Sequence, residues 1–250
     1  MIDLHYWPTP NGWKVSIMLE ECGLDYEVRP VNIGRGDQFA PEFLAISPNN
    51  RMPAIVDHDV PGGPVSVFES GAILIYLAEK TGQFMPADVR GRFDCLQWLF
   101  WQVAGLGPMA GQLGHFKNYA EERIDYAVDR YASEYNRLLG VLDRCLADRA
   151  LDKHAPDSHK FMAGDYSIAD MATWPWVRAH DGYDQSLDEF PHVARWLDAV
   201  GTRPAVARGF AIGADWWTRG SLDEEARRNL FGQTSGRVDE LASQAADGDD

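Results

Sequence analysis

Cysteine is scarce in this chain, which has three, Cys22, Cys95 and Cys145, among 250 residues. Three widely spaced thiols exclude a disulfide scaffold, and free thiols are typical of a reducing compartment, so we expect a cytoplasmic protein whose cysteines are packing residues. Basic residues are also few, because 23 lysines and arginines stand against 38 acids and give a net charge of −15. A protein that neutralises nucleic-acid phosphates needs a basic face, so we expect no nucleic-acid partner.

We also recognise no segment in this sequence that is typical of membrane targeting or membrane anchoring. Its first residues show no basic stretch followed by an apolar one, so we expect no targeting leader. The uncharged run from Cys95 to Gly114 contains three glutamines and a Gly-Leu-Gly-Pro break at 105–108, whereas a lipid-spanning helix is more uniformly apolar. We predict a helix buried in protein there, and no membrane partner.

Motifs for metals and nucleotides are missing as well. The seven histidines form no pair at ligand spacing, so we expect no metal. There is no glycine-rich phosphate loop and no Gly-x-Ser-x-Gly nucleophile elbow. Apolar residues, by contrast, are plentiful: 45% hydrophobic and 12% aromatic residues predict a folded globule, and 250 residues suffice for two domains.

Hydrophobic patterning divides the chain into two parts. The first eighty residues predict strand–helix–strand and then strand–strand–helix, whereas the strand pattern disappears from Pro86 onward. The predicted strands are 2–6, 26–33, 54–57 and 65–68, and the predicted helices are 13–22, 69–80, 88–105, 120–149, 167–179 and 191–200. A small α/β domain followed by an all-α domain is the fold class that this order implies.

We place the domain limits at residues 1–82 and 88–217. The remaining residues, 218–250, form an acidic extension that we expect to be partly flexible, with a frayed end. Within the helical part, Ser167 and Asp170 have the spacing of a capping box, with aspartate in place of glutamate, and we interpret both as fold determinants.

Five short motifs follow one another along residues 9–170. They are Thr-Pro-Asn-Gly-Trp-Lys-Val at 9–15, Pro-Asn-Asn-Arg-Met-Pro-Ala-Ile at 48–55, Phe-Glu-Ser-Gly-Ala-Ile-Leu at 68–74, Gly-Pro-Met-Ala-Gly-Gln-Leu-Gly-His-Phe at 107–116 and Gly-Asp-Tyr-Ser-Ile-Ala-Asp at 164–170. Together they resemble a cytosolic glutathione transferase, and the first and fourth resemble its Nu class, which is related to bacterial disulfide-bond oxidoreductases and to a yeast nitrogen regulator. The resemblance implies a thioredoxin-like βαβ-ββα domain before an all-helical domain, which is the glutathione transferase fold.

Thr9 and Asn11 precede the helix expected from Trp13, and both residue types are common N-caps, so capping alone would explain them locally. In the resembled fold this helix N-terminus faces the thiol of glutathione. A helix N-terminus lowers a thiol pKa from its usual value of about 8.5. The resemblance therefore implies that Thr9 and Asn11 are catalytic and donate to the sulfur. Tyr6 is the alternative, because other classes use a tyrosine hydroxyl, but its place inside the first strand favours packing.

Glu69 and Ser70 begin a predicted helix, where unpaired N–H groups favour an anion. The resemblance assigns Ser70 to the γ-glutamyl carboxylate and Glu69 to the same end of glutathione; helix capping is the local alternative. Met52-Pro53 resembles the family's cis-proline turn, which exposes the Met52 backbone to the cysteinyl part of glutathione.

Three further residues are glutathione-binding candidates. Gln38 resembles a Nu-class glutamine that contacts the glycyl end of glutathione, or it is an ordinary exposed loop glutamine. Arg51 either attracts the glycyl carboxylate or is a solvated loop charge. Arg130 matches a Nu-class arginine that reaches a carboxylate of glutathione, or it pairs with Glu134 one turn further along its helix.

The resemblance places Gln112, His115 and Phe116 along the second-substrate cavity, although His115 also fits a surface histidine. The segment 152–160 looks like an insertion, and the tail from about 211 looks longer than is usual for the class. Both bear on the identity of the second substrate.

The resemblance implies a homodimeric enzyme with glutathione as co-substrate. It would reduce a small-molecule disulfide by thiol exchange, with a second glutathione supplying the second sulfur. The alternatives are conjugation, or thioether or ether cleavage, of an aromatic electrophile. A non-catalytic glutathione-binding regulator is a further alternative, because a fold does not fix a function. We expect the apolar helix around 98–101 to supply surface for the dimer.

Overall fold

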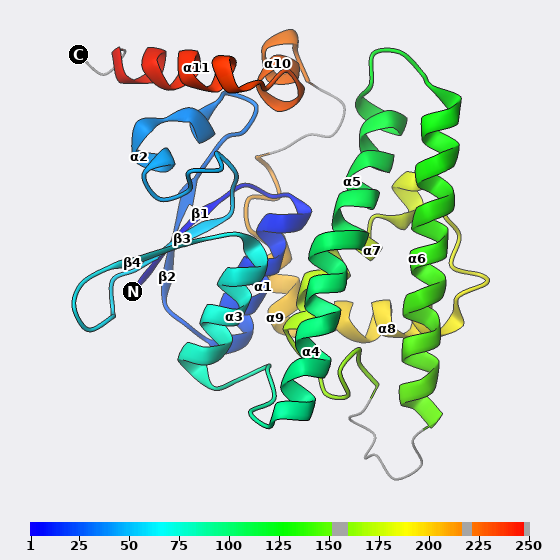
Figure 1. Cartoon of the computed structure of the whole chain (residues 1–250). Coiled ribbons are helices and arrows are strands. Elements are labelled where there is room, and N and C mark those ends of the chain that lie inside the picture. Colours follow the sequence, from blue (N-terminus) through cyan, green and yellow to red (C-terminus); the bar gives the residue numbers. More distant parts are fainter. Residues whose placement is uncertain (152–159, 217–221, 248–250) are drawn as a thin grey trace. The chain divides into compact units, whose positions relative to one another are not determined.

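The computed structural model in Figure 1 describes residues 1–151, 160–216 and 222–247. The chain divides into two compact units, one formed by Met1–Ile73 with Arg208–Asp250 and the other by Leu74–Ala207. Except for Lys160, the segment that we interpreted as an insertion lies outside the described residues.

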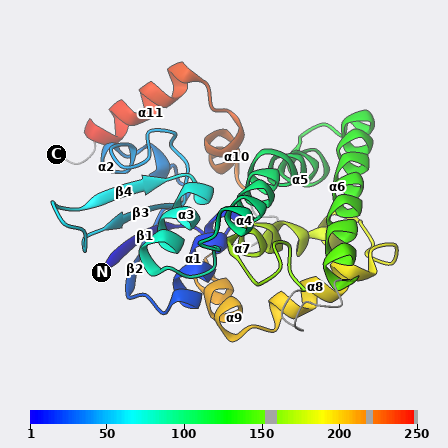
Figure 2. The same ribbon diagram turned by 60° about the horizontal axis from the view of Figure 1, so that its bottom comes forward.

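The first unit contains a four-stranded mixed sheet in the order β2-β1-β3-β4 (Figure 2). Strand β1 pairs parallel with β2 and antiparallel with β3, and β3 pairs antiparallel with β4. The strands are β1 (Ile2–Tyr6), β2 (Tyr26–Pro30), β3 (Ala54–Asp57) and β4 (Val65–Phe68). All four lie where the sequence predicted them, since short alternating runs bounded by turn residues are a strong strand pattern.

Strand β2 ends at Pro30, three residues earlier than predicted. The side chain of Asn32 accepts hydrogen bonds from the backbone N–H groups of Gly34 (3.1 Å) and Arg35 (3.2 Å). Asparagine commonly forms such a turn with its own backbone, and this turn redirects the chain before Ile33 pairs with the sheet.

Helix α1 (Pro10–Cys22) follows β1 and ends at Gly23, which has a left-handed φ of 62°. It begins three residues before the predicted start, with Thr9 as its N-cap, so Asn11 lies inside the first turn and not ahead of the helix. The physical reason is Pro10: its fixed φ suits the first helical position, where its missing N–H is no loss.

Helices also follow the strands of this sheet. Helix α2 (Pro41–Leu44) follows β2, and α3 (Ser70–Thr81), of which only the first turn belongs to this unit, begins directly after β4. The tail contributes helices that the sequence did not predict, α10 (Glu224–Phe231) and α11 (Ser235–Asp247), which lie beside α2 and the loop before it (Figure 1). Asp223 caps α10 by accepting from the N–H of Ala226 at 2.8 Å.

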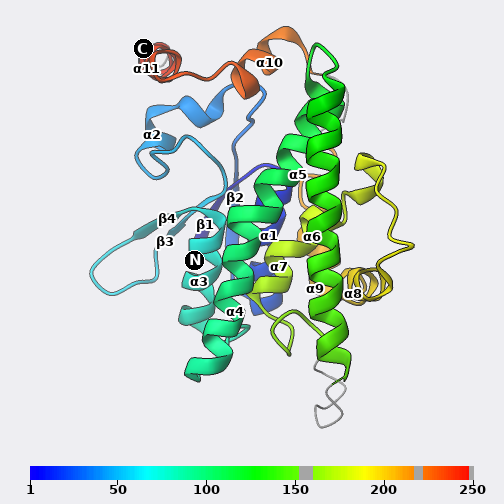
Figure 3. The ribbon, with the colours of Figure 1, turned by 45° about the vertical axis from the view of Figure 1, so that its right-hand side comes forward.

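The second unit is helical. Its helices are α4 (Val89–Trp101), α5 (Gly107–Gly114), α6 (Asp125–Leu151), α7 (Ile168–Val177) and α8 (Pro191–Gly201), followed by the start of α9 (Pro204–Ala211). Figure 3 shows the long α6 beside α5, and α6 also packs on α8, while α4 packs on α7. In the described parts of the chain, no helix is both long enough and apolar enough to cross a membrane.

The Gly-Leu-Gly-Pro sequence does not break the helical path, contrary to the prediction. Residues Gln102–Leu106 form a π-helical turn that leads directly into α5, and Pro108 lies in the first turn of that helix. Proline is tolerated there because the first N–H groups of a helix have no intrahelical acceptor.

The predicted capping box at the start of α7 is confirmed. Asp170 is fully buried and accepts from Trp196 Nε1 (2.8 Å) and from the backbone N–H groups of Met162 and Ser167 (both 3.0 Å). Burial raises the pKa of Asp170 to about 6. This aspartate therefore joins three segments of the second unit and serves the fold.

Candidate functional site

The N-terminus of α1 lies against Met52. Thr9 Oγ1 accepts from the N–H of Gly12 (3.4 Å) and donates to Met52 Sδ at 3.4 Å. A Cβ on Gly12 would come within 2.3 Å of the Trp7 carbonyl oxygen and 2.9 Å of Met52 Cε, so only glycine allows this approach. The hydroxyl of Thr9, the first turn of α1 and Met52 therefore meet at one place.

The Met52–Pro53 peptide bond is cis, which confirms the prediction from the resemblance. Both residues are buried, and β3 begins at the next residue. Ser47 Oγ donates to the carbonyl oxygen of Arg51 at 2.8 Å and holds the loop before the turn. The side chain of Arg51 is exposed on this loop.

The same loop reaches the start of α3. Asn49 Nδ2 donates to Glu69 Oε1 at 3.3 Å. Glu69 has a φ of 69°, a left-handed conformation that costs a non-glycine residue about 1–2 kcal/mol. Such strain is concentrated at binding and catalytic sites. Ser70, which is 8% exposed, begins α3 immediately after it, so its hydroxyl lies beside the N–H groups of the first turn.

Lys14 lies at this candidate site, and the sequence analysis did not single it out. It is 2% exposed, and its Nζ donates to Ser70 Oγ at 3.3 Å. Burial lowers its pKa to about 7, and the negative charge of Glu69 opposes this shift. A signal was present, because Lys14 lies one turn before Ile17 and Met18 on the buried face of α1.

Gln38 is also buried, with 1% exposure, and the C-terminal segment covers it. Its Nε2 donates to the carbonyl oxygens of Ile33 (3.2 Å) and Asn229 (3.5 Å), and its Oε1 has no hydrogen-bond partner within the described residues. Asn229 in turn donates to the Gly34 carbonyl at 2.9 Å. Asn229 was not predicted, because nothing in its local sequence shows that α10 docks on this loop.

A second contact of the tail lies nearby in the chain. Asn50 Nδ2 donates to Gln233 Oε1 at 3.1 Å, two residues before Met52. The C-terminal segment thus contacts both the loop of Gln38 and the loop of the cis-proline turn.

Tyr6 has a packing role. It is 0% exposed, its hydroxyl donates to the Ile212 carbonyl at 3.1 Å, and its ring meets Trp216 edge-on at 6.3 Å. Burial raises the pKa of its hydroxyl well above the usual range. A buried phenol of such low acidity, which already donates to a carbonyl, is a poor hydrogen-bond donor to a thiolate.

The remaining predicted residues belong to the second unit. Gln112 is exposed, and the His115 ring meets Phe116 edge-on at 5.2 Å. Phe116 stacks on Tyr131 at 5.6 Å. Arg130 is 57% exposed, and its Nη1 lies 3.8 Å from Glu134 Oε2, which is the ion pair weighed as its alternative role.

The three cysteines offer no activated thiol. Cys95 and Cys145 are buried, and burial raises the pKa of Cys95 and brings that of Cys145 to about 12. Cys22 lies at the C-terminal end of α1, where the helix dipole opposes a thiolate. Any thiolate at the other end of α1 must therefore come from a bound molecule. Within the described ranges, no cluster of three or more His, Cys, Asp or Glu side chains is placed to hold a metal.

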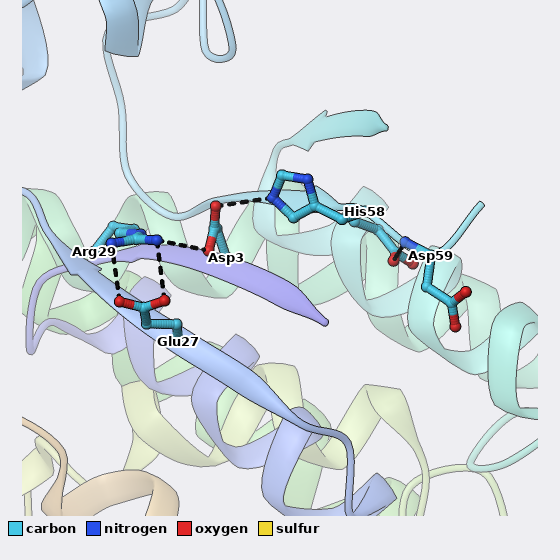
Figure 4. A network of polar contacts seen from close by, with 6 residues as sticks. Asp3, Glu27, Arg29, His58 and Asp59 are labelled. Carbon is cyan, nitrogen blue, oxygen red and sulfur yellow. Dashed lines mark hydrogen bonds and ion pairs between the residues drawn. The ribbon is translucent and has the colours of Figure 1, made fainter. Parts of the chain in front are cut away.

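A cluster of charged side chains on the sheet links neighbouring strands (Figure 4). Arg29 on β2 bonds to Glu27 (2.9 Å) and to Asp3 on β1 (3.3 Å), and His58, which follows β3, lies 2.9 Å from the same Asp3 carboxylate. Such exposed pairs contribute about 0–1 kcal/mol each, so they join three neighbouring strands without building a reactive site.

Comparison with known proteins decides the family. Residues 2–79 match the family model "Glutathione S-transferase, N-terminal domain". Disulfide-bond oxidoreductase YfcG of Escherichia coli (strain K12) is 49% identical over 211 residues, which cover 83% of this chain and 94% of that protein. The chain belongs to the glutathione S-transferase family.

Two solved structures of bacterial glutathione transferases resemble the present chain over 84% of its length. One, from Pseudomonas fluorescens pf-5, has two glutathione bound; it is 45% identical with a TM-score of 0.75, and 92% of that chain is covered. The other, from Pseudomonas putida, has one glutathione disulfide bound per subunit; it is 47% identical with a TM-score of 0.76, and 91% is covered. The predicted fold, a thioredoxin-like domain with an all-helical domain, is the glutathione transferase fold.

Proposed function

We propose that this transferase is a glutathione-dependent disulfide-bond reductase in which Thr9 and Asn11 stabilise the glutathione thiolate. The observation that carries the proposal is the contact of Thr9, the N-cap of α1, with Met52 beside the cis bond to Pro53. The name of YfcG and the glutathione disulfide of the Pseudomonas putida structure support the same chemistry.

We assign most of the proposed glutathione contacts to residues of the first unit. Ser70 would hold the γ-glutamyl carboxylate at the N-terminus of α3, and Glu69 the neighbouring ammonium. The Met52 backbone would pair with the cysteinyl residue at the cis turn to Pro53. Gln38 and Arg51 would serve the glycyl end, while the roles of Arg130 and of the second-substrate residues Gln112, His115 and Phe116 remain predictions.

The proposed reaction needs no protein thiol. The thiolate of the first glutathione attacks one sulfur of a small disulfide, the S–S bond breaks, and the departing thiolate takes a proton. A second glutathione thiolate then attacks the mixed disulfide, which releases the second thiol of the substrate and forms glutathione disulfide. The first turn of α1 and its two side-chain donors favour the thiolate over the thiol throughout.

We further propose a homodimer that acts in the cytoplasm. Helix α4 exposes three large apolar side chains along one face, Val89 (72%), Phe93 (64%) and Phe100 (59%), which a second subunit would cover. The free cysteines suit a reducing compartment. Light scattering at micromolar concentration should give twice the chain mass, and a particle of 28.0 kDa would contradict the dimer.

The function is tested by following the reduction of a small disulfide by glutathione. We expect turnover in the wild type and in Cys22→Ser, and a strong loss in Thr9→Ala/Asn11→Ala. An aromatic electrophile assayed in parallel separates disulfide reduction from conjugation. If the chain binds glutathione but turns over neither substrate, a regulatory role replaces the enzymatic one.

A further inference from the structure

The buried ammonium of Lys14 is not used in the reaction described above. It lies on the inner face of α1 with 2% exposure, among apolar residues such as Val15 and Met18. Burying a lysine is costly unless nearby groups compensate for its charge. A hydrophobic residue would fill this position at lower cost, so the charge calls for a functional explanation.

The direction of the contact with Ser70 supplies that explanation. An ammonium only donates, so in the 3.3 Å contact the serine oxygen is the acceptor. The hydroxyl proton of Ser70 must then point away from Lys14, and it is free to be donated to another group. Ser70 is at the N-terminus of α3, where helix N–H groups also favour an anion.

We propose that Lys14 is a positioning residue for glutathione: from beneath Ser70 it turns the serine hydroxyl toward the γ-glutamyl carboxylate and supplies a buried positive charge for that carboxylate. This inference rests on the proposed binding of glutathione at Ser70. If the proposal holds, the charge state of Lys14 depends on whether glutathione is bound. A residue with only a packing role would not show this coupling.

The coupling has a definite sign. In the free protein the pKa of Lys14 is about 7, and the negative charge of Glu69, which precedes α3, acts on it. A ligand carboxylate brought next to Ser70 favours the ammonium and raises this pKa. Slightly above neutral pH, binding should therefore take up a proton, and the affinity should fall as the pH rises.

The experiment is titration calorimetry with S-methylglutathione, which keeps both carboxylates but has no thiol proton to release. Measurements at about pH 7.5 in buffers of different ionisation enthalpy give the number of protons taken up on binding. We expect a substantial fraction of one proton in the wild type. Lys14→Met should abolish the uptake and weaken binding about tenfold to hundredfold, the effect of losing a charged hydrogen-bonding group.

Lys14→Arg is the matched variant. Its guanidinium keeps the charge but does not titrate, so binding should be largely retained while the proton uptake disappears. This pair of results separates a charge effect from a packing effect even if the methionine variant does not fold. Normal binding in the wild type without proton uptake would overturn the role of Lys14 and leave the proposed function intact. Absence of binding in the wild type would overturn both.

Discussion

Asn49 Nδ2 lies 3.3 Å from Glu69 Oε1, and this bond ties the loop of the cis-proline turn to the strained residue that precedes α3. The two ends of the proposed glutathione site are thereby held at a fixed spacing. The bond joins an amide donor to a carboxylate acceptor that lie twenty residues apart in the sequence.

Asn49→Asp should weaken glutathione binding. The change keeps the shape of the side chain but places a second carboxylate against Glu69, so the bond is replaced by repulsion. Loss of one exposed hydrogen bond is worth about 0.5–1.5 kcal/mol, and the repulsion adds to it. The KM for glutathione should rise severalfold. An affinity equal to that of the wild type would show that the loop does not depend on this contact.

Ser70→Ala should act on binding more than on chemistry. Its proposed partner is a carboxylate far from the sulfur, so the hydrogen bond would be equally strong in the ground and transition states. Its loss should cost roughly 1.5–3 kcal/mol and raise the KM for glutathione tenfold or more, with kcat nearly unchanged. Steady-state kinetics with varied glutathione check this, and an unchanged KM would remove Ser70 from the site.

Lys14 should leave a pH signature in stability. Its pKa is about 7 in the folded chain, below its ordinary value of 10.5. Between these values the unfolded chain binds more protons, so the free energy of unfolding should rise with pH, by at most about 1.4 kcal/mol per pH unit. Lys14→Met should remove this slope. Urea unfolding at about pH 7 and at about pH 9 measures the change of the unfolding free energy with pH. An equal change in the wild type and in Lys14→Met would contradict a titrating Lys14.

Asn229→Ala should disturb the glycyl end of the site. The variant loses the bond to the Gly34 carbonyl that anchors α10 over Gln38. The KM for glutathione should rise, whereas that for γ-glutamylcysteine, which lacks the glycine, should change little. Arg228→Ala, on the exposed side of the same helix, is the control. An equal effect on both thiols would mean that Gln38 does not serve the glycyl end.

Part of this structure could be predicted from the local sequence alone. The strands, the hairpin at Pro61–Pro64 and the capping box of Ser167 were predictable because each depends on neighbouring residues. The start of α1 was placed three residues too late, since Pro10 was not recognised as a first helical residue. Asn229 was missed because it becomes buried only when a distant segment packs on it, whereas Lys14 was missed although its place on the apolar face of α1 was visible in the sequence.

The π-helical turn at Gln102–Leu106 was missed for a different reason. Glycine and proline usually end a helix, and hydrophobic periodicity does not distinguish an interruption from one widened turn. The family motifs predicted a candidate site region, but the contacts of Thr9 with Met52 and of Asn49 with Glu69 required the folded chain.

The central claim is that Thr9 and Asn11, and not Tyr6, hold the glutathione thiolate. The pKa of the bound thiol, followed by the ultraviolet absorbance of the thiolate, tests it most directly. In the wild type this pKa should lie below the free value of about 8.5. In Thr9→Ala/Asn11→Ala it should rise by roughly one to two units for each donor lost, because each partner is charged. Thr9→Ser and Tyr6→Phe should leave the pKa of the bound thiol unchanged. A rise in Tyr6→Phe with no rise in the double variant would contradict the assignment.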